Sequence, residues 1–138
     1  MDIASRNVCV GSGPLTIEEV VEVARGAAPV QIDDEAMHEV ARTRQLIDAL
    51  ADDDQPHYGV STGFGALATR HIPLAQRAQL QRSLIRSHAA GSGPEVEREV
   101  VRALMLLRIS TLATGRTGVR PATLQTYVAL LNAGLTPV

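Results

Sequence analysis

The chain has 138 residues, of which 45% are hydrophobic and 20% are charged, and its formal net charge is −2. This size and composition are typical of one globular domain, and the charge balance argues against nucleic-acid binding through phosphate contacts. With one Phe, two Tyr and no Trp, a core must be built from aliphatic side chains. The single cysteine, Cys9, excludes an internal disulfide and a cysteine-based zinc site.

Two helices are predicted in the first part of the chain. The first begins at Thr16, whose hydroxyl can cap the first turn, and Glu19 three residues later completes a capping box. A glycine then suits its end, because glycine readily adopts the conformation found just beyond a last turn. The second is predicted to begin at Asp33 or Asp34 and to end at residues 52–54, because apolar residues recur between them with helical spacing.

Three further helices are predicted after a glycine-rich loop, at residues 73–91, 94–115 and 121–134. Each begins with a proline, which suits a first helical turn, and each ends at a glycine. The middle one is apolar on nearly all sides, which is typical of a helix buried in a larger protein. Its predicted buried face consists of Val96, Val100, Val101, Leu104, Met105 and Ile109. Because no segment alternates apolar and polar residues, we predict an all-α fold with about five helices.

The loop before the third helix contains the sequence HYGVSTGFGAL, residues 57–67. It does not match a phosphate-binding loop, because it lacks the Gly-Lys-Ser/Thr of a Walker motif and no predicted strand precedes it. Loops of this length are usually functional or disordered, and two aromatic residues, Tyr58 and Phe64, are unusual in disordered segments. We therefore predict a mobile loop that delivers a side chain to a site.

The candidate acid–base side chains are Tyr58 and His88. A tyrosine in a loop more often packs or forms hydrogen bonds, and a phenol with an ordinary pKa of about 10 needs positive neighbours or helix N-termini to act as a base. His88 shares a helix face with Leu80 and Leu84, which favours a histidine packed and hydrogen-bonded within a helical interface over one with a functional role. The other histidines share no metal-ligand spacing with it, so we predict no metal site.

Four segments resemble, in their order and spacing, the aromatic amino acid ammonia-lyase superfamily and, within it, the histidine ammonia-lyases. They are YGVSTGFGALATRHI, LQRSLIRSHAAGSGPEV, VVRALMLLRISTLATGRTGVRP and LLNAGLTPV. The first contains Tyr-Gly-x-x-Thr-Gly-Phe-Gly, a specific signature of that superfamily, and the similarity extends over about residues 14–138. The resemblance implies the helical, fumarase/aspartase-like fold of these lyases. It also implies a homotetramer in which each active site is built from several subunits. The cytoplasmic location that we expect comes instead from the lone Cys9, which suits a reducing compartment.

The activity implied by the resemblance is the conversion of L-histidine to urocanate and ammonia by a non-oxidative β-elimination. The electrophile of these enzymes is 4-methylidene-imidazol-5-one (MIO), which forms from an internal Ala-Ser-Gly. The resemblance assigns Tyr58 as the base that removes the β-proton, and it places Ser87 and His88 in the substrate pocket. The residues that it implies as loop hinges are Gly59, Gly63 and Gly65.

The Ser87–His88 pair favours histidine as substrate, because a polar histidine side chain can hydrogen-bond an imidazole ring. At the positions of Ser87 and His88, tyrosine-selective relatives have a pair that resembles His-Leu, and phenylalanine-selective relatives usually have an apolar or aromatic pair. Ser61 stands where bacterial histidine ammonia-lyases most often have Asn. The alternatives are a tyrosine or phenylalanine ammonia-lyase or aminomutase, and a non-catalytic helical interaction module derived from a lyase.

No Ala-Ser-Gly occurs in the 138 residues. In the family this triplet follows a few residues after the equivalent of LTPV. We therefore expect residues 1–138 to be a single N-terminal segment of an ammonia-lyase that ends just before the MIO-forming triplet. Such a segment is expected to be inactive by itself, because its base and its pocket histidine have no electrophile to act with.

Overall fold

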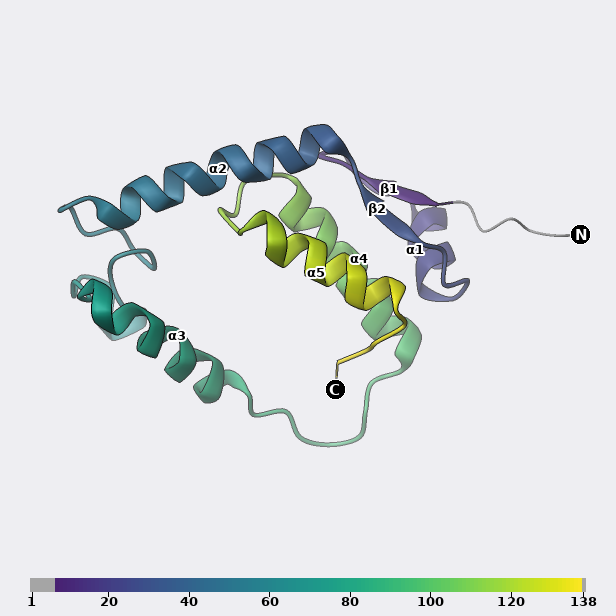
Figure 1. Cartoon of the computed structure of the whole chain (residues 1–138). Coiled ribbons are helices and arrows are strands. Elements are labelled where there is room, and N and C mark those ends of the chain that lie inside the picture. The colour runs from purple at the N-terminus through teal and green to yellow at the C-terminus, as the bar shows by residue number, and fades with distance from the viewer. Residues whose placement is uncertain (1–6, 138) are drawn as a thin grey trace, which may run out of the picture. The chain divides into compact units, whose positions relative to one another are not determined.

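The computed structural model describes residues 7–137. Contacts divide the chain into two compact units: Leu46–Pro94, called here the loop unit, and the described residues on either side of it, called here the core unit. Figure 1 labels the helices and strands along the chain. The elements are β1 (Val8–Val10), α1 (Ile17–Ala24), β2 (Val30–Ile32), α2 (Asp34–Asp52), the 3-10 helix η1 (Gly65–Leu67), α3 (Leu74–His88), α4 (Arg98–Ala113) and α5 (Pro121–Asn132). The five predicted α-helices and the helical fold are confirmed.

The core unit also contains a two-stranded sheet, which corrects the expectation of a chain without strands. Strands β1 and β2 are parallel, with Val8 opposite Val30 and Val10 opposite Ile32. Asn132 at the end of α5 extends this sheet: its side chain accepts the N–H of Val30 at 2.9 Å and donates to the Val30 carbonyl at 2.8 Å. Each strand has three residues, which is too short for an alternating pattern to be recognised in the sequence.

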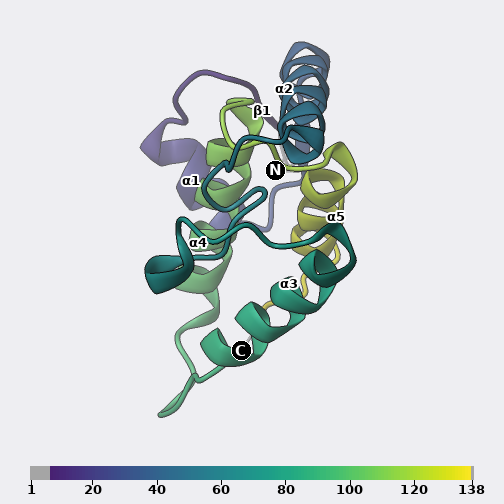
Figure 2. The same ribbon diagram turned by 90° about the vertical axis from the view of Figure 1, so that its left-hand side faces the viewer.

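Aliphatic side chains from both strands and from α1, α2, α4 and α5 form the hydrophobic core of the core unit. Helix α4 packs against α1 and α5, and Figure 2 shows it between them. This position explains why its middle is apolar on nearly all sides. The buried residues of α4 are Arg102, Met105, Leu106, Ile109, Leu112 and Ala113.

Two details predicted for α4 are wrong. The helix begins at Arg98 rather than at Pro94. Part of the predicted buried face is exposed, since Val96, Val100 and Leu104 are 58%, 49% and 66% exposed. Because α4 is apolar nearly all round, hydrophobic periodicity does not distinguish the face that packs in the core unit from the face that stays exposed.

Local hydrogen bonds set the helix ends. Thr16 Oγ1 accepts the N–H of Glu19 at 3.2 Å, and the Glu19 carboxylate accepts the N–H of Thr16 at 2.8 Å, so the predicted capping box is confirmed. Asp33 Oδ2 caps α2 by accepting the N–H of Ala36 at 3.2 Å. Helix α3 ends at His88, slightly earlier than predicted. Among residues 7–137, no helix is long and apolar enough to cross a membrane.

Candidate functional site

The buried interior of the loop unit contains two hydroxyl side chains. Ser61 and Thr62 are 0% and 2% exposed. With Gly63 they are the only buried residues between positions 46 and 94, a range that the structure describes in full. Both hydroxyls form hydrogen bonds, as buried polar groups require. The interior of this unit is therefore polar and lies within the glycine-rich loop.

Residues 57–62 form a compact turn, called here the Tyr58 turn after the side chain that it presents. The carbonyl of His57 accepts the N–H groups of Val60 and Ser61 at 3.1 and 3.0 Å. In return, the Ser61 hydroxyl accepts the N–H of His57 at 2.9 Å. The turn is thus closed by reciprocal hydrogen bonds between its first residue and Ser61, and its predicted mobility stays a prediction.

Two glycines of the loop occupy positions that a side chain would disturb. Gly59 has a φ of +71°, and a Cβ there would lie 3.2 Å from the ring of Phe64. At Gly63, a Cβ would lie 2.5 Å from the Cβ of Leu67, so two parts of the loop touch there. Gly65 has a φ of +54° with open space around it. The close contacts at Gly59 and Gly63 and the positive φ of Gly59 and Gly65 all favour glycine, whereas the hinge role of the three residues stays a prediction.

Tyr58 projects from its turn and is 66% exposed. Its ring meets the ring of Phe64 edge to face, with the ring centroids 6.0 Å apart and the ring planes at 83°. Such aromatic pairs contribute about 0.5–1.5 kcal/mol beyond area burial. The contact with Phe64 therefore favours one orientation of Tyr58 and leaves most of the side chain accessible.

Arg77 of α3 connects the two ends of the loop. Its Nη1 donates to the carbonyl of Ala51 at 2.6 Å, in the last turn of α2, and its Nε donates to the carbonyl of Ile72 at 3.1 Å. A cation interacts favourably with the negative end of the α2 dipole. The N–H of Ile72 donates in turn to the carbonyl of Ser61 at 2.8 Å. The Tyr58 turn therefore lies beside the beginning of α3.

Ser87 and His88 form the last turn of α3. The Ser87 hydroxyl donates to the carbonyl of Leu84 at 2.8 Å and lies 3.0 Å from Nδ1 of His88, which itself lies 2.9 Å from the same carbonyl. Because a carbonyl only accepts, the contact between Nδ1 and the Leu84 carbonyl is a hydrogen bond only when Nδ1 carries a proton. Ser87 and His88 therefore act as one group, in which Ser87 helps to orient the imidazole.

Tyr58 lies apart from this pair. Helix α3 has 15 residues, so its two ends lie roughly 20 Å apart at the usual helical rise. The Tyr58 turn lies beside the first end, as Figure 1 also shows for the loop, and His88 occupies the last position of the helix. Within one copy of the described chain, no hydrogen bond joins Tyr58 to Ser87 or His88.

Sequence reasoning missed three side chains that shape the loop unit: Asp53, His57 and Arg77. Nε2 of His57 lies 2.8 Å from Oδ2 of Asp53. This hydrogen bond is the main cause that lowers the pKa of the Asp53 carboxyl below its usual value, and a bond from the N–H of Gln55 adds to it. The i, i+4 spacing of Asp53 and His57 was the available signal.

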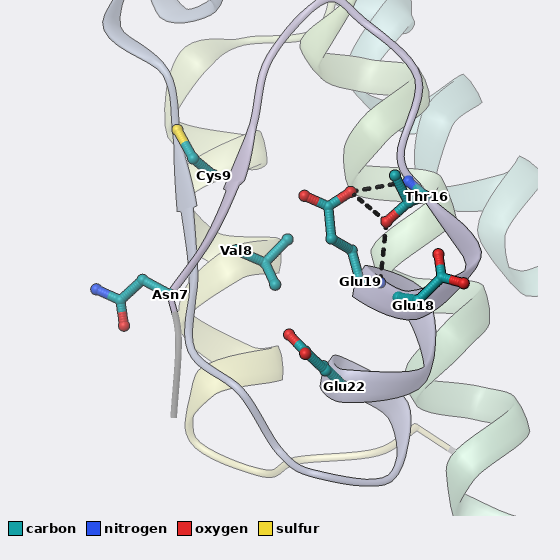
Figure 3. A pocket seen from close by; sticks show the side chains of 7 residues that line it. All are labelled: Asn7, Val8, Cys9, Thr16, Glu18, Glu19 and Glu22. Atoms are coloured by element: carbon teal, nitrogen blue, oxygen red, sulfur yellow. Dashed lines mark hydrogen bonds between the residues drawn. The ribbon is translucent and has the colours of Figure 1, made fainter. Parts of the chain in front are cut away.

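A hollow in the core unit, between β1 and the beginning of α1, contains none of the predicted site residues. Figure 3 shows that the carboxylate of Glu19 faces Thr16 within it, and the dashed lines there are the hydrogen bonds of the capping box. The thiol of Cys9, which also lines the hollow, is free. The acidic lining of the hollow therefore reflects the capped start of α1. Among residues 7–137, no group of three His, Cys, Asp or Glu side chains could hold a metal ion.

Known proteins match both the sequence and the structure of the chain. The histidine ammonia-lyase of Streptomyces avermitilis is 58% identical over 131 residues, which cover 95% of this chain and 26% of that protein. Ergothionase from Treponema denticola, in complex with desmethyl-ergothioneine sulfonic acid, has a TM-score of 0.91 at 32% identity and covers 96% of this chain and 27% of its own. Tyrosine aminomutase from Streptomyces globisporus has a TM-score of 0.89 at 35% identity, with 96% and 25% covered.

The chain spans about a quarter of the length of these relatives. The family model described as aromatic amino acid lyase matches residues 15–138. This match includes the Tyr58 turn, helix α3 and its terminal Ser87–His88 pair, and it covers nearly the whole chain. The chain therefore belongs to the aromatic amino acid lyase family.

Proposed function

We propose that this chain contributes Tyr58, Ser87 and His88 to a histidine ammonia-lyase, which converts L-histidine to urocanate and ammonia. The observation that carries the proposal is the 58% identity to a histidine ammonia-lyase over 95% of the chain. Identity to ergothionase and to the tyrosine aminomutase is lower, at 32% and 35%. The hydrogen bond of Nδ1 of His88 to the Leu84 carbonyl supports the same substrate, because it leaves Nε2 of the exposed ring available for a hydrogen bond with the imidazole of a histidine.

Tyr58 is proposed as the base. Its phenolate oxygen takes the proton from Cβ of histidine, the electrons of that C–H bond form the Cα=Cβ bond, and the Cα–N bond breaks to release ammonia from the protonated amino group. The 66% exposure of Tyr58 supports this role, because the side chain is open to a substrate. Loss of a general base typically costs about 10²–10⁴-fold in rate.

The residues of this chain do not fit the electrophile that the family resemblance implies. MIO forms from Ala-Ser-Gly, and the triplet does not occur in these 138 residues. In the complete lyases it supplies the electrophilic activation of the substrate. We therefore propose that residues 1–138 are the N-terminal segment of such a lyase and have no activity by themselves.

We further propose that the active form is a cytoplasmic homotetramer whose active sites combine several subunits. The separation of Tyr58 from His88 supports this proposal. The Tyr58 turn lies beside the beginning of α3 and His88 lies at its end, so the main chains that carry them are separated by about the length of the helix, roughly 20 Å, which is longer than a histidine molecule. In an assembly, one subunit can supply the base and another subunit can supply the imidazole-binding pair, so that both reach the same substrate.

The test is a fusion enzyme in which residues 1–138 replace the matching segment of the Streptomyces avermitilis histidine ammonia-lyase. Urocanate is followed by its ultraviolet absorbance. We expect turnover in the fusion, and none with residues 1–138 alone. Tyr58→Phe should reduce kcat by about 10²–10⁴-fold, whereas Tyr127→Phe, the same change at the other tyrosine of the chain, should leave kcat nearly unchanged.

Substrate choice is tested on the same fusion. His88→Leu should raise the KM for histidine, and His71→Leu serves as its control. A fusion that releases ammonia from tyrosine rather than histidine would assign the tyrosine branch of the family. Near-normal turnover in Tyr58→Phe would show that another group is the base.

A further inference from the structure

The first residue of the Tyr58 turn is held from outside the turn as well as from within it. The main chain of His57 closes the turn through Ser61, and its ring reaches Asp53 at 2.8 Å. Asp53 directly follows the last residue of α2, and its Oδ1 accepts the N–H of Gln55 at 3.1 Å. The side chains of Asp53 and His57 are 42% and 29% exposed, respectively. The pair thus links the end of a helix to the turn that presents Tyr58.

We propose that Asp53 and His57 position Tyr58 for proton abstraction through the hydrogen bond between their side chains. The inference rests on the base role proposed for Tyr58. Tyr58 directly follows His57, so the direction of its side chain depends on the main-chain torsions at this junction. The hydrogen bonds between His57 and Ser61 hold the turn together, and the bond to Asp53 fixes the turn relative to the end of α2.

The alternative is a surface ion pair without a functional role. Half-exposed ion pairs typically contribute less than about 1 kcal/mol to stability, so this pair is expected to have little effect on folding. A small displacement of a reacting group, by contrast, can cost much more in rate than in stability. The two explanations therefore differ in whether kcat changes while stability does not.

The chain provides a matched control in Asp54. It has the same side chain as Asp53, follows it directly, and forms no side-chain hydrogen bond with the described residues. Asp53→Ala and Asp54→Ala therefore remove the same charge from the same segment, and only the first breaks the contact with His57. Asp53→Asn keeps an acceptor oxygen for the ring and removes the charge.

Two measurements test the inference. In the fusion enzyme, Asp53→Ala and His57→Gln should each lower kcat by about three- to tenfold, with KM within about twofold, because the pair positions the base without binding substrate. The double variant should be no worse than either single variant, and Asp53→Asn should recover much of the lost rate. In residues 1–138 alone, Asp53→Ala should accelerate hydrogen exchange of the Val60 and Ser61 amides by about three- to tenfold.

The inference is overturned if Asp53→Ala matches Asp54→Ala in kcat, if the two single effects simply add, or if the lost rate accompanies a lower melting temperature. An unaltered fusion without turnover refutes the proposed function, and this inference then fails with it. A fusion that depends on Tyr58 but is unaffected by Asp53→Ala overturns the positioning pair alone.

Discussion

Replacing Arg102 with Met is expected to destabilise the core unit by about 2–3 kcal/mol. Arg102 is 2% exposed. Its Nε and Nη2 donate to the carbonyl of Val23 at 3.0 and 2.8 Å, and its Nη1 donates to the carbonyl of Leu131 at 3.0 Å. These carbonyls lie in the last turns of α1 and α5, where main-chain acceptors have no helical N–H partner. One buried cation thus satisfies two helix ends.

The size of this destabilisation depends on the hydrogen bonds that each carbonyl keeps when Arg102 is replaced by Met. Met preserves an unbranched apolar side chain but donates no hydrogen bond. The carbonyl of Val23 loses both guanidinium bonds, which costs about 1–3 kcal/mol for a buried acceptor. The carbonyl of Leu131 keeps the N–H of Gly134 at 3.1 Å, so its loss is nearer about 1 kcal/mol. Burial and, secondly, Arg98 lower the pKa of Arg102, and removal of a desolvated cation offsets part of this cost.

Urea unfolding of the 138-residue chain, followed by circular dichroism, measures this effect. With a denaturant dependence of about 2 kcal/mol/M, the midpoint should fall by about 1–1.5 M. Arg108→Met is the matched control, because Arg108 lies on the same helix and is exposed, and its effect should stay within about 0.5 kcal/mol. Equal midpoints for the two variants would mean that relief of desolvation outweighs the lost hydrogen bonds, and the reasoning would be refuted.

Three other predictions concern local structure. Gly59→Ala should cost about 1–2 kcal/mol because of its φ of +71°, as measured by urea unfolding, and Gly13→Ala, which has open space, should cost less. Thr16→Ala should cost about 1 kcal/mol through loss of the α1 cap, and an unchanged melting temperature would contradict this. The stabilising contribution of the Asp53 carboxylate should be complete above pH 3.8 and disappear as the pH falls through its lower folded-state pKa. The NMR titration midpoint of that carboxyl should lie below 3.8 and rise in His57→Gln; a midpoint that does not move would be inconsistent with the pair.

The helices could be predicted because their signals lie within a few residues. The capping box of α1 needs only Thr16 and Glu19, three positions apart, and it forms as the spacing predicts. Pro121 takes the first position of α5, where its fixed φ suits a helical turn. Pro94 shows the weakness of the same signal, because α4 begins only at Arg98. A proline permits a helix start nearby, but contacts decide where it occurs.

Features that depend on residues far apart in the sequence could not be predicted. The partner of the Val30 main chain is Asn132, 102 positions away. Arg102 lies in an apolar helix, and its burial depends on two carbonyls from other helices. Nothing in the sequence around Ser61 and Thr62 indicates burial, although the structure buries both residues. In the candidate site, the sequence supplies the candidates Tyr58, Ser87 and His88, whose roles stay predictions, whereas the hydrogen bonds that place them could not be predicted.

The two units differ in the forces that shape them, and the candidate site lies entirely in the one without an aliphatic core. Helix α3 has no buried residue, and the interior around Ser61 and Thr62 is polar. Hydrogen bonds are directional and contribute little net stability, so they specify geometry more strongly than they stabilise the fold. The main chain at Tyr58 is thus placed by the hydrogen bonds of the neighbouring His57, and the only ring contact of its side chain among the described residues is the one with Phe64. Substitutions that leave the core unit intact should therefore still displace the candidate base, because its position and the stability of the chain depend on different contacts.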